Sequence, residues 1–258
     1  MNGVGPSRRG LIAASAGLGG LALAGCDRLS ASSRAQALIG GAQALTMDAQ
    51  RLLLSGQPLA KEYPPSAISR VFKPNGTTMP SDPDYQAMLR DGFGSWRLAV
   101  GGLVERPLSL SLSDLKALPT RTQITRHDCV EGWSCIGEWT GVQLSRILAR
   151  SGVARGAKFV VFRCADNLGA TLDLPGQYYE SIDFFDAFHP QTILAWAMNG
   201  APLDAAHGAP LRLRLERQLG YKMAKYVMRI DLVASFQNIA GGKGGYWEDR
   251  GYQWYAGI

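Results

Sequence analysis

Short segments of β-type sequence, separated by glycine and proline, most limit what this 258-residue chain can fold into. Trp96–Val104 and Pro107–Leu112 alternate apolar and other side chains, whereas Lys158–Cys164 is an almost continuous apolar run. The first pattern is typical of half-buried strands and the second of a strand inside a sheet. Further strands are expected at residues 120–127, 194–198, 211–215 and 226–233.

Few helical segments interrupt these strands. Gly141–Leu148 has apolar side chains at helical spacing, and Asp114–Ala117 is expected to be a short helix capped by Ser113. Tyr178–Phe188 contains another helical piece. There is no regular βαβ repeat and no glycine-rich phosphate loop, which disfavours nucleotide-binding folds. The sequence therefore predicts an α+β fold with a mixed sheet, as a single domain at residues 64–258.

The charge balance narrows the range of partners. The net charge is +6, with 46% hydrophobic and 19% charged residues, and the basic residues are scattered rather than gathered in a run. A nucleic-acid-binding tail is therefore not expected. A mild basic excess suits an anionic cofactor or substrate.

The first 26 residues have the pattern of an export signal. Paired arginines in Ser7–Ile12 precede the weakly apolar run Ala13–Ala24, as in a twin-arginine signal, although a buried helix or membrane anchor is the alternative. Cys26 ends a segment that resembles a bacterial lipobox, and simple cleavage nearby is the other possibility. We predict a periplasmic protein with a lipid on Cys26, held at the inner membrane.

Residues 27–63 are expected to form a tether. They are rich in alanine, serine and glutamine and poor in aromatic residues, with helical stretches such as Ala35–Leu54.

The remaining cysteines do not form a zinc motif. Cys129, Cys135 and Cys164 include no CxxC pair, so a structural zinc site is not expected. A disulfide between Cys129 and Cys135 is one possibility, and an odd number of thiols leaves at least one unpaired.

Cys129 is the strongest candidate for chemistry. It lies on an expected loop beside Asp128 and Glu131, whose negative charges raise the pKa of a free thiol. A bound metal cation reverses this effect, because a coordinated thiol loses its proton. One alternative is a buried cysteine with a structural role only, and another is a hydrolase that uses His189 or His207 as base.

Three motifs carry a family resemblance. His127–Ser134 resembles the metal loop of the sulfite-oxidase-type molybdopterin enzymes, and most closely the bacterial branch that includes the periplasmic protein-methionine-sulfoxide reductase catalytic subunit. His207–Arg212 and Tyr221–Lys225 resemble the second and third motifs of that family, in the same order.

The resemblance implies a molybdenum cofactor with Cys129 as the single protein ligand of the metal. It further implies cofactor contacts from Asn75, Cys164, His207, Arg212, Met223, Ala224 and Lys225. An arginine fork and a nearby lysine are well suited to clamp the phosphate of the pterin.

The resemblance also implies a reaction, in which two electrons and one oxygen atom are transferred. Sulfite oxidases place arginines soon after the metal cysteine, but this chain has Glu131, Trp133 and Ser134 there, which favours reduction of an S-oxide. Glu131 is either a proton donor or a hydrogen-bond acceptor within the loop. Electrons are expected from a membrane-bound b-type haem protein.

Rival hypotheses remain open at this point. They are sulfite oxidation with a cytochrome acceptor, a non-catalytic pterin-binding lipoprotein, and a structural lipoprotein without metal. Because the chain ends without the dimerisation domain of sulfite oxidases, a monomer is expected. The aromatic residues of the tail either cover the site or close the core: Tyr246, Trp247, Trp254 and Tyr255.

Overall fold

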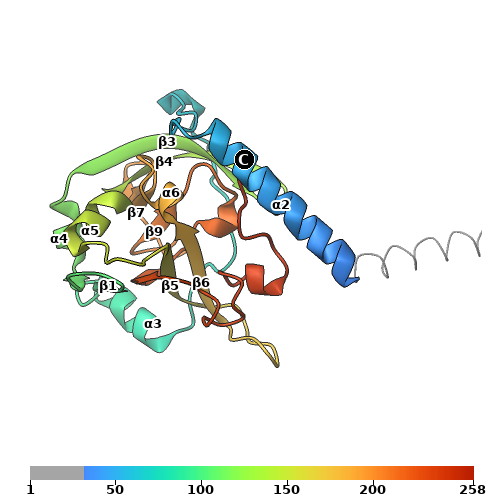
Figure 1. The fold of residues 1–258 in the computed structure, drawn as a ribbon. Coiled ribbons are helices and arrows are strands. Elements are labelled where there is room, and N and C mark those ends of the chain that lie inside the picture. The colour runs from blue at the N-terminus through green and yellow to red at the C-terminus, as the bar shows by residue number, and fades with distance from the viewer. Residues whose placement is uncertain (1–31) are drawn as a thin grey trace, which may run out of the picture. The chain divides into compact units, whose positions relative to one another are not determined.

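A computed structural model describes residues 32–258 (Figure 1). The predicted twin-arginine signal and Cys26 lie outside this range. The chain divides into two compact units, one ending at Gly56 and the other comprising Gln57–Ile258. The first contains helix α2 (Ser33–Leu53), which agrees with the helical stretch expected in the tether. None of the described helices combines the length and apolarity needed to cross a membrane.

The larger unit begins before residue 64, within the stretch expected to be tether. The amide of Tyr63 donates to the Ile124 carbonyl at 2.9 Å, and the amide of Ala60 donates to the Gln191 side chain at 2.7 Å. Residues 57–63 therefore pair with the folded unit.

Two five-stranded sheets form the frame of this unit. In the first sheet, β1 and β10 are parallel and the other neighbours are antiparallel. Its strands, in spatial order, are β2 (Leu108–Leu110), β1 (Leu98–Gly102), β10 (Val227–Val233), β5 (Phe159–Asn167) and β6 (Gln177–Asp183).

The second sheet is antiparallel throughout. Its strands are β3 (Thr120–Cys129), β4 (Trp133–Gln143), β7 (Ile193–Met198) and β8 (Ala201–Pro202), with β9 (Arg212–Arg214) also paired to β7. The predicted α+β fold with mixed strand pairing is confirmed, with the strands divided between two sheets.

Short helices precede, separate and follow the strands along the chain. They are α3 (Pro83–Arg90), α4 (Leu112–Lys116), α5 (Leu144–Ser151), α6 (Phe184–Ala187), and the 3-10 turns η1 (Pro65–Ala67), η2 (Gly220–Lys222) and η3 (Glu248–Arg250). Sequence reasoning missed α3, although Asp82 caps it and Pro83 begins it.

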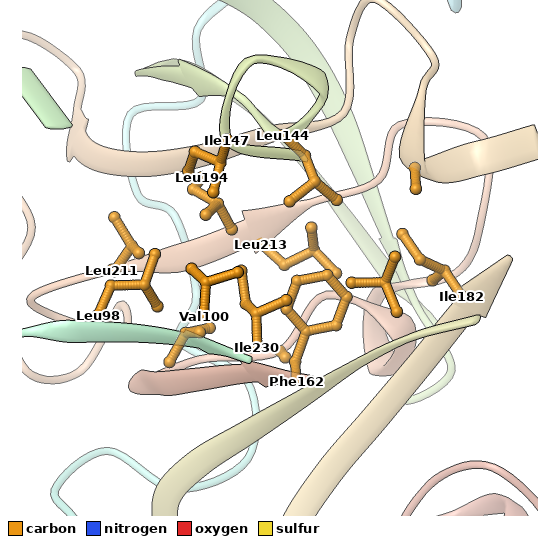
Figure 2. Close-up of a cluster of buried hydrophobic side chains, with 14 of the residues drawn as sticks. Leu98, Val100, Leu144, Ile147, Phe162, Ile182, Leu194, Leu211, Leu213 and Ile230 are labelled. Atoms are coloured by element: carbon orange, nitrogen blue, oxygen red, sulfur yellow. The ribbon is translucent and has the colours of Figure 1, made fainter. Parts of the chain in front are cut away.

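The main core lies between the two sheets. Figure 2 shows side chains of the first sheet facing side chains of the second sheet and of α5. The labelled residues are Leu98, Val100, Phe162, Ile182 and Ile230 of the first sheet, with Leu144, Ile147, Leu194 and Leu213 opposite, and Leu211 just before β9. Because burying one such side chain contributes about 1.5–3 kcal/mol, this layer fixes the positions of the loops at its edge.

Two predicted helix starts were wrong. The helix expected to begin at Gly141 begins at Leu144, because Gly141 remains in β4 and lies so close to β7 that a Cβ there would be 2.1 Å from the Leu194 carbonyl oxygen. The cap of α4 is Ser111 rather than Ser113, because Ser111 and Asp114 bond to each other's backbone in a capping box.

Candidate functional site

A β-hairpin presents Cys129. The residue is the last of β3 and pairs with Trp133 of β4, so the expected loop is in fact the tip of a hairpin. Gly132 turns the chain with a φ of 85°, which favours glycine, and its amide donates to the Cys129 carbonyl at 3.0 Å. The strand pairing fixes the position of the thiol.

The carboxylate of Asp128 ties the hairpin together. It accepts hydrogen bonds from Ser134 Oγ at 2.5 Å and from Arg126 Nε at 2.9 Å. Burial, with the charge of Glu131 adding to it, raises the pKa of the Cys129 thiol. A thiolate at this position therefore needs a cation beside it.

Cys129 opens into a cleft with about 740 Å³ of space, counting the part that is open to solvent. The lining is mostly apolar and aromatic: Asn75, Gly76, Thr77, Cys129, Val130, Glu131, Asp166, Leu168, Tyr178, Tyr221, Met223, Lys225, Trp247 and Tyr252.

Two buried cations stand at and behind this cleft without a carboxylate partner among residues 32–258. Arg212 donates to Asn75 Oδ1 at 3.0 Å and to the His207 carbonyl at 3.2 Å, and its Nε has no partner there. Lys225 Nζ donates to the carbonyls of Asn75 and Ala206, at 2.7 and 2.9 Å, and to that of Thr77.

Burial makes both positive charges costly. Burial and then the neighbouring Arg214 lower the pKa of Arg212 to about 9. Burial and then Arg212 lower the pKa of Lys225 to about 7. Repulsion between unpaired buried cations is relieved by an anion, so this cluster fits a phosphate group.

His127 belongs to β3 of the hairpin and contacts the buried Arg214 of β9. Its Nδ1 lies 3.1 Å from Arg214 Nη1 and 3.2 Å from Met223 Sδ. Burial, followed by the charges of Arg212, Arg214 and Lys225, holds the pKa of His127 well below its usual range. The ring is therefore neutral, with Nδ1 accepting from Arg214 and the proton on Nε2.

The structure brings five of the predicted site residues to one cleft: Asn75, Cys129, Glu131, Met223 and Lys225. Arg212 and His207 lie directly behind it. His207 is held by Asp204 at 2.7 Å and by the Phe72 carbonyl at 3.1 Å, and its own carbonyl accepts from Arg212.

Two of the predicted residues do not reach the cleft wall. Ala224 is buried, and its carbonyl accepts from the Leu213 amide at 2.8 Å. Cys164 packs in the main core, and burial raises the pKa of its thiol well above the usual range.

Glu131 has local partners as well as a place in the cleft. It accepts from Trp133 Nε1 at 2.9 Å and lies 3.6 Å from Lys73 Nζ. Its side chain is 47% exposed, so it connects the cleft with solvent.

Tyr221, the first residue of the third motif, also lines the cleft. Sequence reasoning missed other residues of the cleft wall: Thr77, Asp166, Leu168, Tyr178 and Tyr252. Asp166 had a usable signal, since it is a carboxylate that continues an apolar strand. It is buried, its Oδ1 has no hydrogen-bond partner among the described residues, and burial raises its pKa to about 7. The other residues come from separate elements and carry no local motif.

The alternatives to a metal-binding Cys129 find little support in this geometry. Cys129, Cys135 and Cys164 are free thiols, and the β3–β4 register places Cys135 opposite His127. Neither His189 nor His207 lines the cleft around Cys129. His189 instead contacts the Pro58 carbonyl at 3.2 Å.

Comparison with known proteins agrees with this arrangement. A family profile described as "Oxidoreductase molybdopterin binding domain" matches residues 86–238. The chain is also 38% identical to a protein of Azospira oryzae that is provisionally named protein-methionine-sulfoxide reductase subunit YedZ1. This match covers 98% of the present chain and 88% of the Azospira protein. The chain belongs to the molybdopterin-binding oxidoreductase family.

Within this molybdopterin-binding family, other relatives match a smaller part. The protein-methionine-sulfoxide reductase catalytic subunit MsrP of Xanthomonas axonopodis pv. citri is 38% identical over 56% of this chain and 47% of its own. MsrP of Campylobacter jejuni is 34% identical over 53% of this chain and 48% of its own. The chain therefore spans about half the length of the MsrP proteins that it matches.

A solved structure gives a partial match. It is the sulfane dehydrogenase SoxCD from Paracoccus pantotrophus, at 26% identity and a TM-score of 0.48, over 54% of this chain and 38% of that one. Membership of the molybdopterin-binding family rests on the family profile and on the Azospira relative.

The residues present fit the cofactor of this family. A half-buried thiol opens into a mostly apolar cleft, and two buried cations without a carboxylate partner among residues 32–258 lie at and behind it. The orphaned Nε of Arg212 and the unpaired Oδ1 of Asp166 are donor and acceptor groups for a polar ligand.

Proposed function

We propose that this protein binds molybdenum-molybdopterin and reduces an S-oxide, with methionine sulfoxide in a polypeptide as the leading substrate. Cys129 would ligate the metal, while Arg212 and Lys225 would bind the phosphate of the pterin. Asn75, His207 and Met223 would orient the pterin. When bound, the cofactor would supply two-electron redox chemistry for oxygen-atom transfer.

The distribution of charge in the cleft is the observation that supports an S-oxide as the substrate. Its charged lining residues are two carboxylates, Glu131 and Asp166, and the deeply buried Lys225. Two arginines of this chain, Arg126 and Arg163, could take the place of the substrate-binding arginines of sulfite oxidases. They pair instead with Asp128 and Asp231, respectively. Such a cleft suits a neutral, dipolar sulfoxide better than doubly charged sulfite.

The reaction needs protons, and the cleft has acids to deliver them. Reduction breaks the sulfur–oxygen bond, and the sulfoxide, two electrons and two protons give a sulfide and water. Glu131 is positioned to relay protons from solvent, because it is half exposed and faces the cleft.

The proposed cell location rests on the sequence alone, and the name of a relative supports the proposed electron supply. We propose export by the twin-arginine route, lipid attachment at Cys26, and electrons from a membrane-bound b-type haem protein. MsrP is named as a catalytic subunit, which is consistent with a separate electron-transfer partner. A mass spectrum of the membrane-extracted protein tests the anchor, because a chain that begins upstream of Cys26 contradicts it.

The first experiment measures the cofactor. Protein from a cofactor-competent host is assayed for molybdenum and released pterin, and wild type is compared with Cys129→Ser and the matched control Cys135→Ser. We expect about one metal per chain in wild type and in the control, and altered metal spectra in Cys129→Ser. Wild type that folds but contains neither metal nor pterin would contradict the proposal.

The second experiment decides the reaction. Reduced viologen supplies electrons to the loaded protein, and oxidation of the dye is followed with methionine sulfoxide, with aryl methyl sulfoxides and with sulfoxide-containing peptides. Sulfite-dependent reduction of cytochrome c is measured in parallel. Turnover with sulfite alone would establish sulfite oxidation, and bound cofactor without any turnover would indicate a non-catalytic pterin-binding protein.

A further inference from the structure

The tail beyond residue 238 supplies part of the cleft wall. The family profile ends at residue 238, but Trp247 and Tyr252 line the same cleft as Cys129. The tail, red in Figure 1, runs beside β6, where Gly245 bridges to Glu180 and the Tyr246 amide donates to the Tyr179 carbonyl at 2.9 Å. One side of the site therefore comes from outside the segment that defines the family.

The aromatic rings of the tail form a continuous surface. Trp247 and Tyr252 stack at 5.2 Å between ring centroids with an interplanar angle of 28°. Tyr221 meets Tyr252 edge-on at 5.1 Å, and Tyr246 meets Trp247 edge-on at 5.3 Å. Tyr252 is 41% exposed, so this aromatic wall reaches from the cleft to its mouth.

Buried polar contacts hold the tail in place. Glu248 pairs with Lys222 at 2.6 Å, and both side chains are 1% exposed. Asp249 accepts from Tyr179 Oη at 2.7 Å and from the amides of Gly241 and Lys243, each at 2.9 Å. Tyr221 Oη also donates to the Gln253 carbonyl at 2.6 Å. The aromatic wall is therefore a fixed part of the site.

The chemistry of this wall suits an apolar group attached to sulfur. Aromatic faces attract polarisable sulfur groups and the weakly positive hydrogens beside them, and they exclude water from apolar substituents. The half-exposed Glu131 carboxylate in the same cleft disfavours an anionic substrate, whereas the buried Lys225 is left for the phosphate of the cofactor. The space between these features suits a neutral sulfoxide that carries one substituent larger than methyl.

We infer that Trp247 and Tyr252 are specificity-determining residues, which bind the larger substituent of the sulfoxide against the tail. This inference rests on the proposed S-oxide reduction and adds the substrate class to it. It predicts selectivity for aryl methyl sulfoxides and methionine sulfoxide over dimethyl sulfoxide.

The test uses the molybdenum-loaded protein and the variants Trp247→Ala and Tyr252→Ala. For methyl p-tolyl sulfoxide, KM should rise about 3- to 10-fold in each variant with kcat little changed, since an aromatic contact of this kind is worth about 0.5–1.5 kcal/mol. For dimethyl sulfoxide, KM should be nearly unchanged. Molybdenum content should stay at the wild-type level.

A binding measurement separates this inference from the reaction itself. Calorimetric titration with the non-reducible methyl p-tolyl sulfone should give a Kd that is raised by the same factor in both variants. If wild type reduces no S-oxide but the sulfone binds and loses affinity in the variants, the proposed function fails and the binding role of the tail stands.

Two controls complete the design. Tyr252→Phe keeps the ring and should retain wild-type KM and Kd. Trp254→Phe changes another tail ring, which packs on Phe159 and Phe236 rather than in the cleft, and should also leave both constants unchanged. Unchanged KM and Kd in folded, loaded Trp247→Ala and Tyr252→Ala would overturn the inference, as would equal losses in Trp254→Phe.

Discussion

Two lysines three positions apart in the sequence occupy opposite kinds of environment. Lys222 and Lys225 are both buried, at 1% and 5% exposure. Lys222 bonds to the carboxylates of Glu180 and Glu248 and to the Ser181 carbonyl at 3.0 Å. Within residues 32–258, Lys225 bonds only to backbone carbonyls.

The titration of the two groups follows from these partners. Burial opposes the charge of Lys222, but Glu180 and Glu248 outweigh it, and the pKa of Lys222 is raised. Burial, and then the Glu248 carboxylate, raise the pKa of Glu180 well above its usual range, which favours the neutral form of Glu180 in its trio with Lys222 and Glu248. The pKa of Lys225 is instead lowered to about 7. Lys222 is thus neutralised by the fold, whereas Lys225 is left for an external anion.

The largest effect should come from removing the positive charge of Lys222, which lies between the carboxyl groups of Glu180 and Glu248. Lys222→Met leaves two buried carboxyl groups without their partner, which should lower the free energy of unfolding by about 3–5 kcal/mol. For a domain of this size the melting temperature should fall on the order of 10 °C, measured by calorimetry of cofactor-free protein. A loss of equal size in Lys225→Met would remove the distinction between the two lysines.

The second effect concerns the cofactor. Lys225→Met removes a cation whose charge-assisted bonds to phosphate are worth about 1.5–3 kcal/mol, so cofactor affinity should fall about 10- to 100-fold. Molybdenum and released pterin per chain measure this loss. Lys116→Met, which changes an exposed lysine in α4, is the matched control and should retain wild-type content.

The third effect is a dependence on pH. In cofactor-free protein, folded Lys225 titrates near pH 7, whereas an unfolded lysine titrates near ~10.4. Between these values the unfolded chain binds more protons, so the folded state gains stability as pH rises, by up to about 2 kcal/mol between pH 7 and 9.

Two neighbouring groups also titrate within this pH range: Asp166, whose pKa burial raises to about 7, and Arg212, whose pKa burial lowers to about 9. The contribution of Lys225 is therefore the difference between wild type and Lys225→Met. Denaturant unfolding of wild type and Lys225→Met at both pH values measures the difference. Parallel pH profiles for the two proteins would show that Lys225 is not the titrating group.

The smallest effect sharpens the description of the trio. Because Glu180 remains to pair with Lys222, Glu248→Gln, which replaces one carboxyl by a neutral group of similar shape, should cost less than about 1 kcal/mol at pH 7. A loss as large as that of Lys222→Met, in the same calorimetric experiment, would mean that Lys222 needs both carboxyl groups.

The sequence predicted the parts of the site that have local motifs. Strand β3, which ends at Cys129, and strand β9, which contains Arg212, both follow from short patterns. Apart from the family resemblance, the sequence did not indicate which of Lys222 and Lys225 is left to bind a phosphate, because the partners of both lysines lie on distant elements. Cys164 was expected to contact the pterin, but the alternation of β5 places its side chain in the main core.

What the amino-acid sequence determined by itself was local: the β-rich α+β fold, the turn glycine after Cys129, and the residue types needed for a soft metal and a phosphate. The tertiary structure decided which charges are neutralised and which are left unpaired, since Glu180, Glu248 and Asn75 meet their lysines only after the strands have packed. It also decided that the tail forms a wall of the cleft. The physical reason is that desolvation and counterion distance depend on contacts between residues far apart in the chain, which no local pattern specifies.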